Sequence, residues 1–248
     1  MEEIAPFKEA EDFDNVGLLV GNQTAKVLNV VVSLDLTKNV LKKAKEKKAE
    51  LIVTHHPVIF NPLKKVLKTD LIYELIDSKI SVICAHTNLD KAEFGVSYLL
   101  AKELKLLDVE ILKDTMNFGR VGNLKQPLSF LEFVKFVSNC LKTPVKAVKT
   151  SKKIKRVAVV SGSGYFALKA AEKNADALVT GESKHNILLK AKEKDFCFVD
   201  ASHFATENIF VKHLVLMLNK KFNSFGVNFF ESFQQNPCCF VNGEQIWD

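Results

Sequence analysis

Short β-branched runs alternate with segments of helical spacing along the first half of the chain. We interpret the apolar runs as buried strands and the intervening amphipathic segments as helices, because alternation with a period of two or of about 3.6 distinguishes them. The predicted strands are 27–33, 50–54 and 80–86, and the predicted helices are 39–48, 70–78 and 95–106. Thr37 can cap the first helix. Regular strand–helix alternation predicts an α/β fold with a parallel sheet and right-handed crossovers.

Glycines and a proline interrupt this pattern at 115–127, and a second α/β stretch follows. Its predicted strands are 145–148, 156–162, 177–181, 196–202 and 226–232, and its predicted helices are 128–141, 165–174, 184–193 and 203–222. We therefore predict two α/β domains. The first is discontinuous and comprises 1–117 plus 195–248, and 118–194 form the inserted second domain.

Composition places the chain among ordinary globular proteins, with 47% hydrophobic and 26% charged residues. The opening residues, MEEIAPFKEAEDF, do not resemble a secretory leader. No apolar run approaches the ~18–20 residues that a membrane span requires. We expect a cytoplasmic protein with no membrane partner.

The net charge of +6 raises the question of nucleic-acid binding. Nearly all of the positive charge is lysine, since Arg120 and Arg156 are the only arginines. Arginine pairs with phosphates and guanines in a forked geometry, so a sequence-specific DNA-binding protein would normally hold more of it. The lysine-rich segment 41–48 fits the solvated face of a helix. Specific nucleic-acid binding is therefore not the favoured interpretation.

Polar side chains follow each predicted strand of the first half at its carboxyl end. Asp35 follows the first strand, His55 and His56 follow the second, and His86 and Asp90 follow the third. Open α/β sheets bind ligands in the crevice outside these strand ends. The five side chains are thus expected at one edge of the sheet.

The second half repeats this arrangement in "FVDASHFATE", where a strand leads into His203 and Glu207. These two residues are four apart and share one face if the helix begins at His203. His86 and Glu182 are further candidates, for proton transfer. Each feature also has a structural interpretation: a turn at the paired histidines, a helix cap at Asp90, or a surface pair at His203 and Glu207.

Adjacent residues of a strand point to opposite faces, so His55 and His56 are expected to diverge. Diverging imidazoles suit two metal ions, which such sites hold ~3.5–4 Å apart with bridging carboxylates. Asp90 and Glu207 can supply the carboxylates and His203 a further nitrogen. We predict a dinuclear site, and these ligands fit Zn, Fe, Mn, Co or Ni about equally well.

Five blocks, in order along the chain, resemble one known family: "AEDFDNVGLLVG", "VTHHPVIF", "AHTNLDKAEFGV", "TGESKHN" and "SHFATE". They resemble the NGG-interacting-factor-three-like family, often labelled GTP cyclohydrolase I type 2 homologues. The resemblance implies two α/β domains with a dinuclear metal site in the cleft between them, and toroidal homohexamers. It places His55, His56, Asp90, His203 and Glu207 at the family's metal ligands. Asn186 departs from the family pattern, since many relatives have a second histidine there.

These observations together favour a dinuclear-metal-dependent hydrolase that acts on a nucleotide-like small molecule, with a metal-activated water as nucleophile. The family label points to chemistry like that of GTP cyclohydrolase I type 2. Two alternatives remain open. One is a metal-dependent phosphohydrolase, and the other is a non-catalytic metal-binding scaffold protein that forms a ring.

Overall fold

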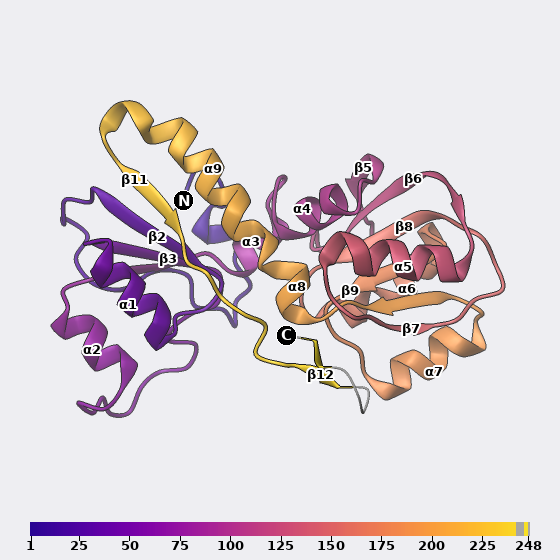
Figure 1. Cartoon of the computed structure of the whole chain (residues 1–248), viewed down its shortest axis with the longest axis horizontal. Helices are drawn as coiled ribbons and strands as arrows, with labels where there is room; N and C mark the ends of the chain where they lie inside the picture. Colours follow the sequence, from indigo (N-terminus) through magenta and orange to yellow (C-terminus); the bar gives the residue numbers. More distant parts are fainter. Residues whose placement is uncertain (242–245, 248) are drawn as a thin grey trace. The chain divides into compact units, whose positions relative to one another are not determined.

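The computed structural model describes residues 1–241 and 246–247 and has a mixed α/β fold with two main sheets (Figure 1). The chain forms two compact units. Unit 1 comprises Met1–Leu89 and Phe210–Gln234, and unit 2 comprises Asp90–Ile209 and Gln235–Asp248.

Unit 1 is built on a five-stranded sheet with the order β1-β4-β3-β2-β11. Its strands are β1 (Gly17–Val20), β2 (Asn29–Ser33), β3 (Leu51–Thr54), β4 (Ser81–Cys84) and β11 (Asn228–Glu231). The four strands from β4 to β11 pair in parallel, as the strand–helix alternation predicts. The edge strand β1 pairs antiparallel with β4, and no strand was predicted there.

Helices cover both faces of this sheet. The helical elements of unit 1 are η1 (Phe7–Glu9), α1 (Lys38–Glu46), α2 (Leu71–Asp77), most of α9 (Ile209–Phe222) and η3 (Asn223–Phe225), and α3 (Thr87–Lys91) runs across the boundary into unit 2. Leu41 of α1 and Leu75 of α2 pack in one buried cluster with Ile52 of β3. Figure 1 shows α9 on the other side of the sheet from α1 and α2. As predicted, Thr37 caps α1: its hydroxyl accepts a hydrogen bond from the Val40 N–H at 3.3 Å.

Unit 2 contains a six-stranded sheet with the order β5-β6-β8-β9-β10-β7. Its strands are β5 (Leu107–Ile111), β6 (Arg120–Leu128), β7 (Lys146–Val148), β8 (Ile154–Val160), β9 (Ala177–Thr180) and β10 (Cys197–Asp200). The central strands β8, β9 and β10 are parallel, and antiparallel strands complete both sides of the sheet. A separate two-stranded ladder joins β12 (Phe240–Val241) to β13 (Ile246–Trp247).

The sheet of unit 2 lies between two layers of helices. These are α4 (Val96–Glu103), α5 (Phe130–Leu141), α6 (Leu168–Asn174), α7 (His185–Glu193) and α8 (His203–Glu207), with the short η2 (Gly164–Ala167) before α6. Buried residues of α4 and α5 form one cluster with the sheet, and buried residues of α6 and α7 form another. Among the described residues, no helix has both the length and the apolar character needed to cross a membrane.

Three predicted features differ from the structure. The interruption expected at 115–127 contains most of β6, and β5 precedes it without having been predicted. The single helix expected over 203–222 is two helices, α8 and α9, separated at Asn208. Residues 90–117, 195–209 and 235–241, which were expected in the first domain, lie in unit 2, where β5 and β10 pair with other strands of the second sheet.

Candidate metal-binding residues

Three histidines gather at the carboxyl ends of β3 and β4 in unit 1. His55 and His56 directly follow β3, and His86 follows β4 by two residues. Each offers one ring nitrogen to a group in which the ligand atoms all lie within 4.8 Å of one another. The ring centroids are 5.2 Å apart for His55 and His56, and 5.1 and 5.7 Å from these two to His86. Three imidazoles in one place can supply nitrogen ligands to a divalent ion.

The expectation that His55 and His56 diverge is wrong. Strand β3 ends at Thr54, and the backbone bends directly after it. The N–H groups of His55 and His56 both donate to the Leu34 carbonyl, at 3.2 and 3.0 Å. The alternation of a strand therefore does not apply to the pair, and both rings lie near His86.

Hydrogen bonds orient the His55 and His56 rings. The Nδ1 atom of His55 lies 2.9 Å from the Ala85 carbonyl, and Nδ1 of His56 lies 2.7 Å from the Asp35 carboxylate. A carbonyl or carboxylate oxygen can only accept, so Nδ1 carries the proton and Nε2 carries the lone pair in the neutral ring. This is the arrangement that orients histidine ligands in metal sites.

His86 is oriented in the same way by Asp14, which lies in the first of the five family blocks. The His86 Nδ1 lies 2.9 Å from Asp14, whose carboxylate also accepts the Thr87 N–H at 3.0 Å. Burial opposes ionisation of Asp14, but the hydrogen bonds from His86 and Thr87 outweigh it and hold the pKa of Asp14 well below its usual value. Asp14 is thus a buried carboxylate anion whose position orients the His86 ring.

The loop that carries Asp35 is held by Gln234, which follows β11. The Gln234 side-chain oxygen accepts hydrogen bonds from the Leu34 N–H at 2.8 Å and the Asp35 N–H at 3.2 Å. It also accepts the Ser33 hydroxyl at 2.8 Å, and its amide donates to the Asp35 carbonyl at 3.2 Å. The end of β2 and the carboxylate beside His56 therefore depend on a residue about 200 positions later in the chain.

Unit 2 holds the second group, centred on His203 at the start of α8. Its Nε2 lies 2.8 Å from Glu207, and its Nδ1 lies 2.7 Å from Glu182. The Ser163 hydroxyl donates to Glu182 at 2.6 Å. This bond, together with His203, lowers the pKa of Glu182 despite the opposing effect of partial burial. The expectation that His203 and Glu207 share a helix face is confirmed.

The loop after β8 lies against this group. The ideal Cβ position of Gly162 is 2.0 Å from Glu207 Oε1 and 3.3 Å from His203 Nε2, so a side chain has no space there. The neighbouring Ser161 hydroxyl lies 3.5 Å from the carboxylate of Asp90, which is largely buried. One loop therefore contacts all three ligand candidates of unit 2.

Each group offers donor atoms of the kind that metal ions bind. The group of unit 1 has imidazoles held by oxygen acceptors, and the group of unit 2 has an imidazole with buried carboxylates. These nitrogen and oxygen donors suit Zn, Fe, Mn, Co or Ni. The sequence predicts five of these residues as metal ligands, and this assignment stays a prediction: His55, His56, Asp90, His203 and Glu207.

Known proteins resemble this chain over most of its length. Residues 1–237 match the family model of Duf34/NIF3 (NGG1p interacting factor 3). A Clostridium acetobutylicum protein named GTP cyclohydrolase 1 type 2 homolog is 31% identical, and the match covers 92% of this chain and 90% of the relative. NIF3-like protein 1 of Drosophila melanogaster is 29% identical, with 97% and 87% covered. The crystal structure of Staphylococcus aureus hypothetical protein SA1388 has a TM-score of 0.90 at 27% identity, covering 97% of this chain and 96% of that one.

Proposed function

The chain belongs to the Duf34/NIF3 family, and from this membership and its ligand chemistry we propose that it is a dinuclear-metal-dependent hydrolase of a nucleotide-like small molecule. The observation that carries the proposal is the group of three imidazoles in unit 1, each with Nδ1 held by an oxygen acceptor. Such preorganised imidazoles lose little freedom when they bind a metal ion.

In this proposal two divalent ions are bound by His55, His56, Asp90, His203 and Glu207. The covalent path of the chain supports a shared set of ligands. Asp90 follows His86 by four residues. Three residues after Glu207 comes Phe210, whose ring centroid lies 5.3 Å from that of His55. Two of the three passages of the chain between the units thus lie close in sequence to a candidate ligand, Asp90 or Glu207.

The remaining polar groups orient the ligands or move protons. Asp35 and Glu182 fix the rings of His56 and His203 through their Nδ1 atoms. His86, held by Asp14, keeps Nε2 as its basic nitrogen and can take a proton from a substrate or water. Bound divalent ions would supply Lewis acidity for the activation of a water as nucleophile. The relatives' name favours attack on a purine ring, and attack at phosphorus is the second possibility.

The test combines metal content with turnover. The protein is loaded separately with Zn, Fe, Mn, Co and Ni, its bound metal is measured by mass spectrometry, and hydrolysis of nucleotides and phosphoesters is followed. We expect about two ions per chain, and expect Glu207→Gln and His56→Ala to lose both metal and turnover. His185→Ala is the control, because His185 is an exposed histidine at the start of α7. Metal-free wild-type protein after every loading would refute the proposal.

The rival function is a non-catalytic metal-binding scaffold that assembles as a homo-oligomeric ring. One observation favours it: the glycine-containing loop 161–166 uses backbone N–H groups that could otherwise bind a phosphate for hydrogen bonds within the protein. The Gly162 N–H donates to the Thr206 hydroxyl at 3.1 Å, and the Gly164 N–H donates to the Thr180 hydroxyl at 2.9 Å. Two bound ions with no turnover of any tested substrate, and retained assembly, would support the scaffold.

A further inference from the structure

One segment of unit 2 accounts for the net positive charge of the protein. Residues 142–156 contain seven lysine and arginine side chains and no aspartate or glutamate, against a net charge of +6 for the whole chain. The rest of the chain is therefore close to neutral. This basic segment runs from the end of α5 through β7 and an exposed turn into β8.

Three cations of the segment have structural partners. Lys146 pairs with Asp200 at 3.2 Å, Lys155 donates to backbone carbonyls of β6, and Arg156 pairs with Glu110. The other four form no ion pair within the described part of the chain, and all four are exposed: Lys142, Lys149, Lys152 and Lys153. These four side chains are available to an anionic partner.

Hydrogen bonds hold the turn that carries three of these lysines. The Thr150 hydroxyl donates to the Asp195 carbonyl at 2.8 Å, and the Ser151 N–H donates to the Asp195 carboxylate at 2.8 Å. Asp195 lies two residues after the end of α7, so the turn is fixed beside that helix. A fixed turn presents its cations at a low entropic cost on binding.

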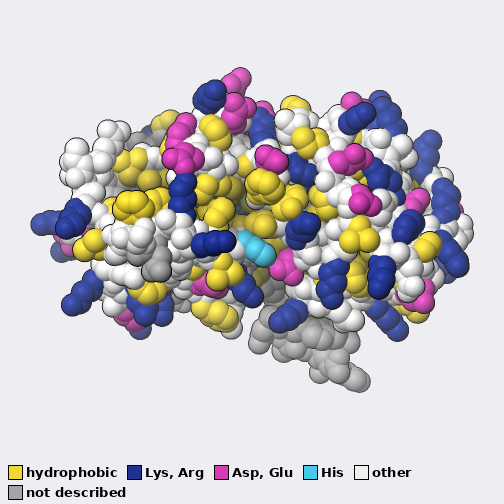
Figure 2. All heavy atoms as spheres, turned by 90° about the horizontal axis from the view of Figure 1, so that it is seen from above, with side chains coloured by type: hydrophobic (Ala, Val, Ile, Leu, Met, Phe, Trp, Pro, Cys, Tyr) yellow, Lys and Arg dark blue, Asp and Glu magenta, His cyan; other side chains and the backbone are white. Residues whose placement is uncertain are grey.

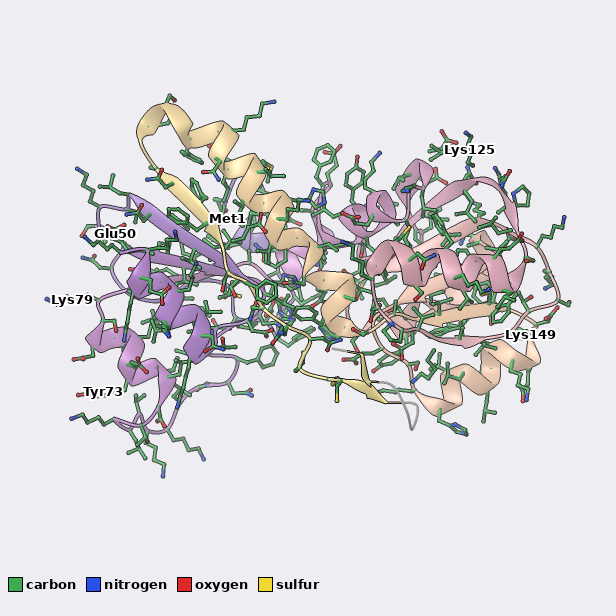
Figure 3. All side chains as sticks on the ribbon, in the orientation of Figure 1. Met1, Glu50, Tyr73, Lys79, Lys125 and Lys149 are labelled. Carbon is green, nitrogen blue, oxygen red and sulfur yellow. The ribbon has the colours of Figure 1, made fainter. Side chains whose placement is uncertain are left out.

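Two acidic groups, Asp195 and Glu132, face the turn and offset part of its positive charge. Hydrogen bonds from serines and, to a smaller extent, Lys152 and Lys153 lower the pKa values of Asp195 and Glu132. Their short contacts are with serine hydroxyl and N–H groups. Figure 2 shows Lys and Arg side chains crowded at the right-hand end, which unit 2 forms. Figure 3 shows Lys149 at this end together with Lys125, a further exposed lysine.

We propose that the basic segment 142–156 binds the phosphate backbone of duplex nucleic acid without sequence specificity. Phosphate contacts need positive charge alone, and lysine supplies it. Base recognition favours arginine, and the one arginine of the segment is engaged by Glu110. A bilayer surface fits less well, because none of the exposed large hydrophobic side chains in the described chain lies between 142 and 156 to anchor it. The proposal is independent of the metal chemistry above.

The salt dependence of binding tests this surface. The probe is a fluorescein-labelled 20-base-pair DNA of mixed sequence, and its Kd is measured by anisotropy from 50 to 200 mM salt. Four phosphate contacts predict a log–log slope of about −3.6, or a loss of roughly 150-fold in affinity over this range. The triple variant K149Q/K152Q/K153Q leaves one contact, for which the loss is only about 3.5-fold.

The matched control removes the same charge from unit 1. Lys64, Lys65 and Lys68 are exposed residues between β3 and α2, and K64Q/K65Q/K68Q should keep the wild-type slope. Two results would overturn the proposal: no duplex binding at 50 mM salt, or equal slopes for the two triple variants. Binding to phosphatidylserine vesicles without binding to the duplex would also overturn it, in favour of a membrane surface.

Discussion

A methyl group added at Gly162 should displace Glu207, the carboxylate beside His203. The ideal Cβ at this position lies 2.0 Å from Glu207 Oε1 and 3.0 Å from its Cδ, whereas ordinary van der Waals contact begins at 3.4 Å. In Gly162→Ala the carboxylate oxygen must therefore move by about 1.4 Å, or the loop must move by a similar amount. Movement of the carboxylate would disturb the 2.8 Å contact that its other oxygen makes with His203.

Two costs add in this variant. Gly162 has φ of +59°, and alanine in the left-handed region costs about 1–2 kcal/mol of folding free energy. Displacement of Glu207 adds a second cost, which we expect to weaken metal binding by at least the 10–100-fold typical of disturbed ligand orientation. The first cost is independent of the metal, and the second depends on Glu207.

Gly226→Ala separates the two costs. Gly226 has φ of +69° and nothing within 4 Å of its ideal Cβ, so alanine there meets the same backbone strain without a steric contact. The assays are urea unfolding and zinc titration by calorimetry on wild type and both variants. We expect both variants to lose stability and only Gly162→Ala to lose zinc affinity. Wild-type zinc affinity in Gly162→Ala would refute the assignment of Glu207 as a ligand placed by this loop.

Three further substitutions test other parts of the structure. Gln234→Ala removes the acceptor of two backbone N–H groups, so we expect the free energy of unfolding to fall by about 1–3 kcal/mol. We also expect weaker zinc binding by calorimetry, because Asp35 loses its support. Glu50 accepts two backbone N–H groups that outweigh its partial burial and lower its pKa from 4.5. Wild type should therefore exceed Glu50→Gln in stability above pH ~4.5 in urea titrations, and this advantage should vanish as the pH falls through the lowered native pKa. Thr37→Ala should lower the free energy of unfolding by about 1 kcal/mol in the same assay, because α1 loses its cap. The control, Lys42→Ala at an exposed position within the same helix, should leave it nearly unchanged.

Hydrophobic periodicity predicts the parallel core of both sheets, because buried parallel strands are continuous apolar runs with helices between them. The antiparallel strands β1, β5 and β6 lack that signal. In β5 every residue except Val109 is exposed, and β6 contains Gly122 and Pro127. Proline cannot donate to a ladder, and the β6–β8 register is irregular between Asn123 and Leu128, which includes this proline. Such strands are stabilised by the strands that they pair with, and these partners cannot be identified from the local sequence pattern.

The same limit applies to the candidate site. The candidate ligands are recognisable in the sequence because histidines and carboxylates follow apolar strands. Asp35 and Glu182 also stand out in the sequence, but the pairing of carboxylates with histidines does not, because the partners lie far apart along the chain: Asp14 is 72 residues from His86, and Glu182 is 21 residues from His203. Asp14 also lacks any local pattern that separates a buried acceptor from a turn residue. Only the folded sheet brings it to His86.

Convergence of the histidines changes what the paired motif means. On a continuing strand His55 and His56 would need two separate ligand environments, one on each face. The bend after Thr54 removes this requirement, since both N–H groups bond to the same carbonyl and both rings approach His86. Three imidazoles then share one region, and each has an oxygen acceptor at Nδ1. The adjacency of the two histidines thus concentrates nitrogen donors at one strand end.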